Sequence, residues 1–137
     1  MQRKASAVWK GGLKDGKGTV SSTSGVLSNT PYSFAMRFEN APGTNPEELI
    51  AAAHAACFSM ALSAQLGEAK LTPESISTSA TLTMENLTIT AVHLDVVAKV
   101  PGASAEAFNT AAQNAKAGCP VSKVLNAKIT MDAKLGS

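Results

Sequence analysis

A long, alanine-rich helix is predicted by Asn45-Pro46-Glu47-Glu48-Leu49-Ile50-Ala51-Ala52-Ala53-His54-Ala55-Ala56-Cys57-Phe58. Asn45 suits a helix N-cap, Pro46 suits the first helical position, and Glu48 completes a reciprocal capping box with Asn45. The helix is expected to run to about Leu66 and to end at Gly67. Because it is apolar on nearly every side, we expect it to lie buried at the centre of an assembly.

Strands are predicted on both sides of this helix. Before it, glycine- and asparagine-containing turns separate three expected strands, Ala5–Lys10, Gly18–Leu27 and Tyr32–Glu39. After it, alternating apolar and polar residues predict strands over 76–84, 90–100 and 127–135, with a helix from its cap at Ser104 through Ala117. The order β-β-β-α-β-β-α-β indicates an α+β domain and not a βαβ repeat with a parallel sheet.

Length and composition favour one domain that associates with itself. The chain has 137 residues, and we expect residues 1–137 to form a single domain. Hydrophobic residues make up 45% of it but aromatic residues only 4%, so small aliphatic side chains must fill the core. Alanine-rich helices bury little area on their own, which favours an oligomer.

Charge and patterning exclude several classes of partner. The net charge is +2 with no concentrated basic patch, so nucleic acid is not an expected partner. The N-terminal residues do not have the pattern of a signal peptide, and no stretch reaches about eighteen uncharged apolar residues, so no membrane partner is expected. We therefore expect a cytoplasmic protein, in which permanent disulfides are rare and a cysteine pair is more typically catalytic.

The only two cysteines, Cys57 and Cys119, are too far apart in the sequence for a Cys-x-x-Cys motif or a local metal site. Cys119 precedes Pro120, which would place it at a helix N-cap, where backbone amides favour the thiolate. A small core residue at Cys57 and a chance turn residue at Cys119 are the alternative interpretations. Together, the two thiols predict one sulfur that reacts and one that resolves it, as in a thiol peroxidase.

Arg37 and Glu47 are the predicted partners of the thiolate. A thiolate in an apolar site needs a cation nearby, and arginine stays charged while offering a fork of donors. Glu48 is assigned to the helix cap, which leaves Glu47 free to fix Arg37 by a bidentate contact. Alternatively, Glu47 simply favours the helix dipole. We expect Arg37 to point away from the aromatic face of its strand.

Spacing along the long helix suggests a composite site. Glu47 and Cys57 lie about 15 Å apart along a straight helix. If two such helices cross antiparallel at Ala51–Ala53, Glu47 of one approaches Cys57 of the other. We therefore expect a two-fold dimer with two composite sites.

The two histidines are secondary candidates. His54 shares a helix face with Cys57 and could act as a general base, but a core or interface role is the preferred interpretation. His93 is expected on an exposed strand face, surrounded by solvent. No cluster has the spacing of a zinc site and no glycine-rich phosphate loop occurs, so no metal or cofactor is expected.

Several of these motifs together resemble the osmotically inducible protein C (OsmC) family of organic hydroperoxide peroxidases. The resemblance rests on Gly16-Lys17-Gly18-Thr19-Val20, Ser24-Gly25-Val26-Leu27, Arg37-Phe38-Glu39, Gly43-Thr44-Asn45-Pro46-Glu47-Glu48-Leu49, His54-Ala55-Ala56-Cys57-Phe58 and Ala117-Gly118-Cys119-Pro120-Val121-Ser122. The position of Arg37 resembles the OsmC branch more than the organic hydroperoxide resistance (Ohr) branch. The hairpin near Met84-Glu85-Asn86-Leu87 looks shorter than in typical relatives.

The resemblance implies an intertwined homodimer with long central helices wrapped by β-sheets. It implies that Cys57 is the peroxidatic thiolate, Cys119 the resolving thiol, and Arg37 and Glu47 the activating pair. An organic hydroperoxide would be reduced to an alcohol, the Cys57 sulfenic acid would condense with Cys119, and an external dithiol, lipoyl-type in some members, would reopen the disulfide. Two alternatives are a non-catalytic protein that binds an apolar ligand at the dimer cleft and a structural dimer with a permanent Cys57–Cys119 disulfide.

Overall fold

The computed structural model describes residues 1–136, which divide into two compact units. The first unit is Met1–Leu49 and the second starts at Ile50. The long helix α2 (Pro46–Glu68) begins in the first unit and continues into the second. We describe each unit separately, and the expectation of a single domain stays a prediction.

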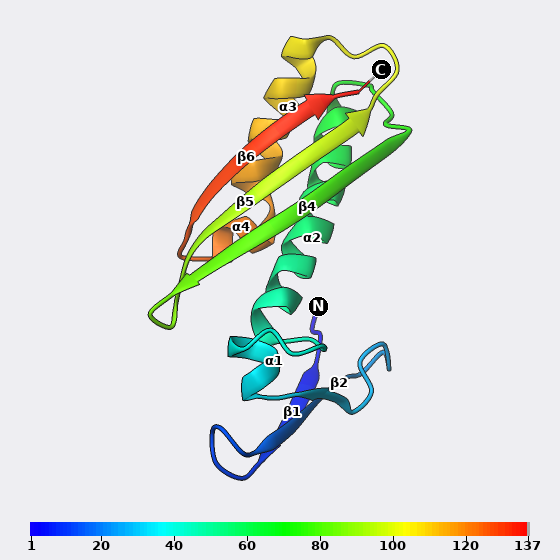
Figure 1. Ribbon diagram of the computed structural model, residues 1–137. Coiled ribbons are helices and arrows are strands. Elements are labelled where there is room, and N and C mark those ends of the chain that lie inside the picture. Colours follow the sequence, from blue (N-terminus) through cyan, green and yellow to red (C-terminus); the bar gives the residue numbers. More distant parts are fainter. Residues whose placement is uncertain (137) are drawn as a thin grey trace. The chain divides into compact units, whose positions relative to one another are not determined.

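The first unit contains a small antiparallel sheet and a short helix (Figure 1). Its sheet order is β1-β2-β3, and its elements are β1 (Ala5–Lys10), β2 (Lys17–Ser22), β3 (Thr30–Tyr32) and α1 (Phe34–Phe38). Gly18 of β2 pairs with Trp9 on one side and with Tyr32 on the other. A Cβ at Gly18 would lie 2.6 Å from each of these rings, whose centroids are 5.5 Å apart. Glycine at this position therefore lets the two aromatic side chains meet across the middle strand.

The prediction of a third strand over Tyr32–Glu39 is wrong beyond Tyr32. Residues Phe34–Phe38 form α1 instead, because Ser33 is its N-cap and the Ser33 hydroxyl accepts a hydrogen bond of 3.3 Å from the Met36 backbone N–H. The alternating pattern of aromatic residues therefore does not mark a sheet face. Arg37 lies in the last turn of α1, with its guanidinium carbon 5.1 Å from the centroid of the Phe38 ring.

The second strand is also shorter than the predicted Gly18–Leu27. It ends at Ser22, where the chain enters a turn closed by hydrogen bonds between Ser22 and Leu27. Gly25 lies in this turn with φ +81°, a conformation that favours glycine.

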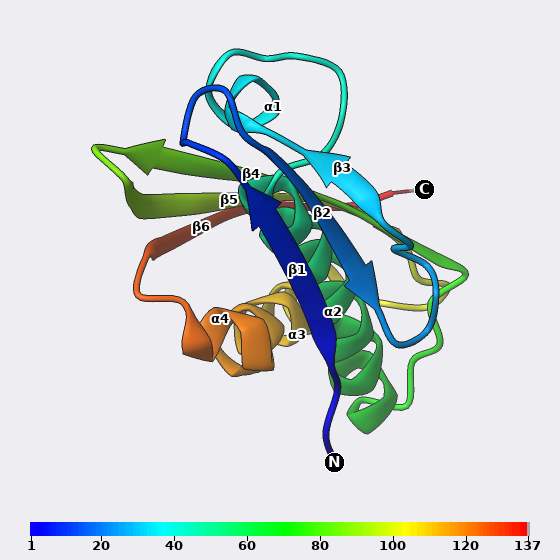
Figure 2. The ribbon, with the colours of Figure 1, turned by 90° about the horizontal axis from the view of Figure 1, so that it is seen from below.

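The second unit packs helices on one face of a three-stranded sheet, as Figures 1 and 2 show. Its sheet order is β4-β5-β6, and its elements after α2 are β4 (Ser75–Glu85), β5 (Thr88–Lys99), α3 (Ala105–Gly118), α4 (Pro120–Val124) and β6 (Lys128–Leu135). Side chains from the helices and from one face of β5 form the core, namely Phe58, Leu62, Leu66, Val92, Leu94, Val96, Ala98, Val100, Phe108, Ala111, Ala112 and Ala115.

The predicted α+β class is confirmed, with one local difference in how strands pair. β4 and β5 are antiparallel, joined by a two-residue turn in which Asn86 and Leu87 both have positive φ. β5 and β6 are parallel, and α3 and α4 form the crossover between them. The unit therefore contains one βαβ connection, which the sequence-based order did not predict. The short helices α1 and α4 are also additions to that order.

The start of α2 matches the predicted cap in part. The Asn45 side-chain oxygen accepts a hydrogen bond of 2.8 Å from the Glu48 backbone N–H. The Glu48 carboxylate accepts one of 2.8 Å from the Thr44 hydroxyl, a partner the sequence reasoning did not consider. Glu48 is therefore occupied at the cap, and Glu47 is free for another partner.

The end of α2 lies slightly beyond the predicted stop, because Gly67 is within the helix. Lys70 adopts the left-handed conformation, with φ 62°. The Leu71 N–H donates to the Leu66 carbonyl and the Lys70 N–H to the Gly67 carbonyl, each at 2.9 Å. This pair of bonds is a Schellman motif, formed here around a lysine.

Only one stripe of α2 is buried within the chain. His54, Phe58, Leu62 and Leu66 recur every four residues and are fully buried. Apolar residues on other sides of α2 are exposed, among them Ala52, Ala53, Ala56 and Met60. By length and composition alone this helix could also cross a membrane, with a mean hydropathy of 1.5, but the core helices of globular domains share these properties.

Candidate functional site

The structure brings the two cysteines into contact. Cys57 lies in the middle of α2 and Cys119 immediately before α4, and a hydrogen bond of 3.0 Å joins their sulfur atoms. Both are free thiols. Cys119 is fully buried, whereas Cys57 is only partly buried. A disulfide has an S–S length of about 2.05 Å, so a movement of about 1 Å would join them.

Cys119 occupies the N-cap position that the sequence predicts. It is both the C-cap of α3 and the N-cap of α4, and Pro120 is the first residue of α4. The Cys119 sulfur accepts a hydrogen bond of 3.5 Å from the Ser122 backbone N–H. The cap therefore aims a backbone donor at the sulfur.

The surroundings shift the pKa values of the two thiols in opposite directions. Burial raises the pKa of Cys57, and the hydrogen bond to Cys119 raises it further, against a smaller lowering by the Val121 backbone. For Cys119, burial also acts to raise the pKa, but hydrogen bonds from Cys57 and Ser122 outweigh it and lower the pKa. The two groups titrate as a pair. Within this unit, the surroundings therefore favour the thiolate of Cys119 over that of Cys57.

Arg37 and Glu47 form the predicted ion pair in the first unit. The Arg37 Nε donates to both carboxylate oxygens of Glu47, at 2.6 Å and 3.2 Å. The expected bidentate contact is therefore made from one nitrogen and not from the fork. Among residues 1–136, no hydrogen bond engages the two terminal nitrogens of Arg37, which leaves them free to donate to an anion.

An aromatic cavity of about 250 Å³ adjoins Arg37 in the same unit. Its lining comes from β1, β3, α1 and the loops beside them, namely Trp9, Leu13, Tyr32, Ser33, Phe34, Arg37 and Phe38. A hydrophobic surface next to free guanidinium donors suits a molecule with an apolar body and a polar end. The sequence analysis did not predict this cavity, because it placed Phe34 and Phe38 on a strand.

His54 is a core histidine, as the preferred interpretation expected. It is fully buried, and its Nε2 shares a hydrogen bond of 2.8 Å with the Ser122 hydroxyl. Burial lowers the pKa of His54, so the ring is neutral. The sequence analysis quoted Ser122 within a motif but assigned it no role. The sequence signal that could have pointed to Ser122 is its position three residues after the Cys119 cap.

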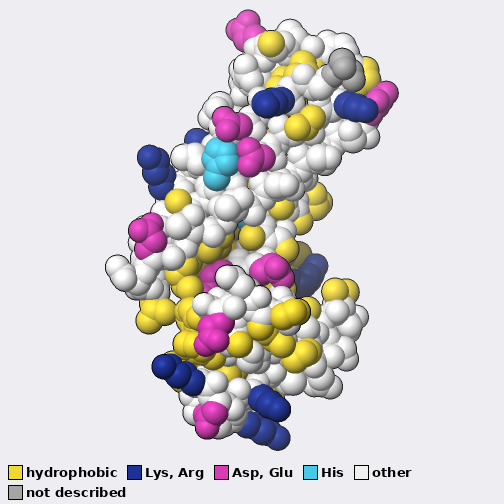
Figure 3. All heavy atoms as spheres, in the orientation of Figure 1, with side chains coloured by type: hydrophobic (Ala, Val, Ile, Leu, Met, Phe, Trp, Pro, Cys, Tyr) yellow, Lys and Arg dark blue, Asp and Glu magenta, His cyan; other side chains and the backbone are white. Residues whose placement is uncertain are grey.

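His93 is not simply surrounded by solvent, which corrects the sequence-based expectation. Its Nε2 lies 3.3 Å from a carboxylate oxygen of both Asp95 and Asp132, and its Nδ1 is 2.6 Å from the Thr130 hydroxyl. This group lies on the sheet face opposite the helices, and Figure 3 shows a histidine beside acidic side chains there. It is the one group in residues 1–136 whose donor atoms lie close enough to hold a metal ion. Both ring nitrogens already have partners in the chain, and both aspartates are exposed.

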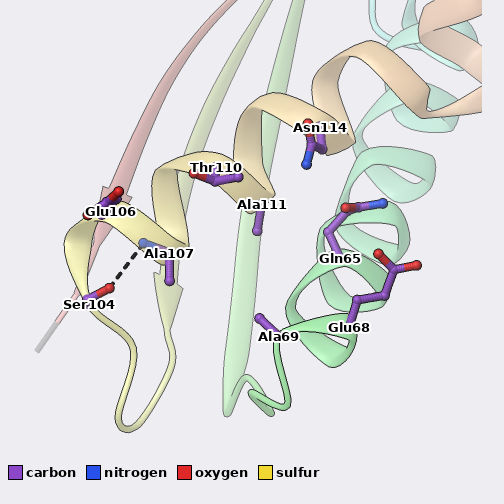
Figure 4. A pocket seen from close by; sticks show the side chains of 9 residues that line it. All are labelled: Gln65, Glu68, Ala69, Ser104, Glu106, Ala107, Thr110, Ala111 and Asn114. Atoms are coloured by element: carbon purple, nitrogen blue, oxygen red, sulfur yellow. Dashed lines mark hydrogen bonds between the residues drawn. The ribbon is translucent and has the colours of Figure 1, made fainter.

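The groove in Figure 4 does not include the two thiols in its lining. It lies between the end of α2 and α3, has a volume of about 460 Å³, and is lined by Gln65, Glu68, Ala69, Ser104, Glu106, Ala107, Thr110, Ala111 and Asn114. Neither cysteine contributes to it. The four predicted site residues form two contacting pairs, Cys57 with Cys119 and Arg37 with Glu47.

Comparisons with known proteins show the family to which this chain belongs. The profile of OsmC-like proteins matches residues 38–134. The chain is 54% identical over 141 residues to Peroxiredoxin OsmC of Escherichia coli (strain K12), covering 100% of this chain and 99% of that protein. The chain belongs to the OsmC family. Its fold is similar to the OsmC-like protein of Mycoplasma pneumoniae, with TM-score 0.77, 16% identity and coverage of 100% and 99% of the two chains.

The organic hydroperoxide resistance protein OhrB of Bacillus subtilis is also similar, with TM-score 0.66, 25% identity and coverage of 96% and 98% of the two chains. The predicted family and the predicted OsmC-type fold are therefore confirmed. With the two thiols in contact, this member of the OsmC family is a thiol-dependent peroxidase.

Proposed function

We propose that this OsmC family member reduces organic hydroperoxides to alcohols, with Cys57 as the attacking sulfur and Cys119 as the resolving sulfur. One observation carries the assignment of the two roles: the sulfurs are 3.0 Å apart, but only Cys57 is accessible from outside the core. A peroxide can reach a partly exposed sulfur. A buried sulfur in contact with it is placed to react with the product.

The chemistry proceeds in three balanced steps. The Cys57 thiolate attacks one peroxide oxygen, the O–O bond breaks, and the alkoxide takes up a proton to leave as an alcohol. Cys119 then attacks the sulfur of the Cys57 sulfenic acid, an S–S bond forms, and the hydroxyl leaves as water. An external dithiol reduces the disulfide by exchange and is itself oxidised to a disulfide. No step needs a metal ion or a cofactor.

Arg37 supplies a cation for the Cys57 thiolate in this proposal. Burial raises the pKa of Cys57, so a positive charge beside the sulfur would stabilise its thiolate. Glu47 holds the Nε of Arg37 and thereby orients the two free terminal nitrogens. These nitrogens are suited to donate to the sulfur and to the departing peroxide oxygen.

The aromatic cavity beside Arg37 supports an organic peroxide as substrate. Its aromatic lining would hold the carbon chain or ring, with the peroxide group at the guanidinium. Hydrogen peroxide has no apolar part to fill it. The name of the Bacillus subtilis relative, which refers to organic hydroperoxide resistance, agrees with this choice.

The active form in this proposal is a homodimer. The exposed side of α2 carries small apolar residues, including Ala52, Ala53 and Ala56, which let a second helix approach closely. A two-fold crossing there would bury this surface and bring Glu47 of one protomer toward Cys57 of the other. The proposed location is the cytoplasm, where a dithiol pool is available.

Peroxide consumption together with a thiol count tests this proposal. The reduced protein is mixed with cumene hydroperoxide or with hydrogen peroxide, without a reductant. We expect one equivalent of cumene hydroperoxide to be consumed with the loss of two thiols per chain, and a slower reaction with hydrogen peroxide. A non-catalytic binding protein would consume neither, and a protein with a permanent disulfide would have no thiols to lose. An equal rate with both peroxides would contradict the assigned substrate class.

A further inference from the structure

The helix that carries Cys57 is tied to the turn that carries Cys119 by a second, fully internal contact. The His54 Nε2 and the Ser122 hydroxyl are 2.8 Å apart, and both side chains are buried. His54 lies one helical turn before Cys57, and Ser122 lies three residues after Cys119. The sulfur–sulfur contact and this hydrogen bond therefore join the same two elements, α2 and α4.

The turn that carries Cys119 needs a contact of this kind to stay in place. α4 has five residues, and a helix of this length has too few internal hydrogen bonds to be stable alone. Ser122 lies in this helix and also donates its backbone N–H to the Cys119 sulfur, at 3.5 Å. The position of Ser122 therefore sets the position of the sulfur.

A histidine at the core position 54 is unfavourable for stability. Its Nδ1 is buried and has no hydrogen-bond partner among residues 1–136. Burying a polar atom without a partner is destabilising, and an apolar side chain of similar size would avoid that cost. The hydrogen bond to Ser122 is the contact that an apolar side chain would not make.

We propose that His54 and Ser122 are positioning residues for the step that forms the disulfide. They hold α4 against α2, so that the Cys119 sulfur stays within reach of Cys57 after Cys57 has been oxidised. This inference rests on the proposed function. Neither residue takes part in the attack on the peroxide, so the first step does not depend on their hydrogen bond.

Two pairs of variants test the hydrogen bond from both of its ends. The His54 pair is needed because the Ser122 side chain also lowers the pKa of Cys119, and only the His54 pair breaks the bond with that hydroxyl in place. Ser122→Ala removes the hydroxyl and Ser122→Thr keeps it. His54→Asn places its amide near the position of Nδ1 and loses the contact, whereas the longer side chain in His54→Gln reaches the position of Nε2 and keeps it. Each pair contains a matched control at the same site.

The experiment follows one turnover of the full-length protein with one equivalent of cumene hydroperoxide. Peroxide loss gives the rate of the first step, and dimedone added at timed intervals, with mass spectrometry, gives the lifetime of the Cys57 sulfenic acid. We expect Ser122→Ala and His54→Asn to lengthen that lifetime by about fivefold to tenfold, as the loss of one hydrogen bond predicts. The first step should stay within about twofold, and Ser122→Thr and His54→Gln should restore most of the resolution rate.

Three results would overturn the inference. If the Cys57 sulfenic acid disappears as fast in Ser122→Ala and His54→Asn as in the unchanged protein, the hydrogen bond does not position Cys119. Equal slowing of both steps would indicate a general loss of structure. His54→Gln resolving as slowly as His54→Asn would indicate packing and not the hydrogen bond. If the unchanged protein consumes no cumene hydroperoxide and loses no thiols, the proposed function fails and this inference fails with it. Normal consumption by the unchanged protein, with unaltered resolution in Ser122→Ala and His54→Asn, overturns this inference alone.

Discussion

The sulfur atoms of Cys57 and Cys119 lie 3.0 Å apart, although Cys119 is fully buried and Cys57 is not. This difference in access is the basis of the different roles that we propose for two chemically identical groups. Burial of Cys119 protects it from direct oxidation, because over-oxidation requires an exposed thiolate. The contact between the two sulfurs lets the buried thiol act only on what forms at its neighbour.

Cys57→Ser should abolish peroxidase activity while the protein still folds. The hydroxyl is close in size to the thiol but is a far weaker nucleophile at neutral pH. Consumption of cumene hydroperoxide measures the activity, and circular dichroism checks the fold. Retention of even about a tenth of the activity would remove Cys57 from the role of nucleophile.

Arg37→Lys should raise the pKa of the Cys57 thiol and slow peroxide reduction by about tenfold or more. Lysine keeps the charge but loses the Nε contact that lets Glu47 orient the guanidinium, and a misplaced group near the reacting atoms is costly. The pH dependence of Cys57 alkylation is the measurement, and its midpoint should move to higher pH.

Lys14→Gln is the control for Arg37→Lys. The Lys14 ammonium lies 5.9 Å from the centroid of the Phe34 ring, at the same aromatic cluster. Removing this charge should leave the alkylation profile unchanged. Equal shifts in both variants would mean that general charge, and not the guanidinium, controls Cys57.

Cys119→Ser should permit the first step and block efficient turnover. Attack on the peroxide needs only Cys57, so one equivalent should still be consumed quickly. The sulfenic acid then lacks its partner and persists, or is oxidised further to sulfinic acid under excess peroxide. Dimedone should label Cys57 in the variant and label it little in the unchanged protein. Normal multiple turnover with a dithiol would contradict the two-cysteine mechanism.

The stability of the unchanged protein should fall below pH 6.5 more steeply than that of His54→Gln. Burial lowers the pKa of His54 below its ordinary value of 6.5, so the unfolded chain binds a proton there that the folded chain does not. This contribution to stability is fully present above pH 6.5 and is lost as the pH falls from 6.5 towards the lower pKa of the folded state. The limiting slope for one group is about 1.4 kcal/mol per pH unit.

Urea unfolding of both proteins at several pH values between 5 and 8 measures this difference. The two curves of stability against pH should run parallel above pH 7 and separate below it. Curves that stay parallel throughout would mean that His54 takes up a proton as readily in the folded protein as in the unfolded chain.

Ala53→Lys should weaken the proposed homodimer. Ala53 is exposed on the small apolar side of α2, and burying an ammonium group between two helices is costly. Ala69→Lys is the matched control, since Ala69 is exposed just after the end of α2. Sedimentation velocity should show a lower dimer fraction only for Ala53→Lys. An unchanged dimer in both variants would contradict an interface formed by this part of α2.

Local sequence signals predicted the elements that depend on neighbouring residues. The Asn45 cap, the Ser104 cap and the position of Cys119 before Pro120 were all correct, because each is formed by contacts within a few residues. The alternating strands β4 and β5 were also correct, since one face of each packs on the core. At α1 the same reasoning was wrong, because the Ser33 cap outweighs four alternating aromatic and apolar residues.

Contacts between distant residues required the tertiary structure. The sequence identified Cys57, Cys119, Arg37 and Glu47 as candidates and, through the family resemblance, their roles. It could not place the two sulfurs in contact, pair His54 with Ser122, or align β5 and β6 in parallel. Each of these depends on the path of the chain through α3 and α4, which brings α4 back against α2. Local sequence patterns identify which residues are candidates for the site. The distances between those residues follow from the packing of the core that lies between the helices and the sheet.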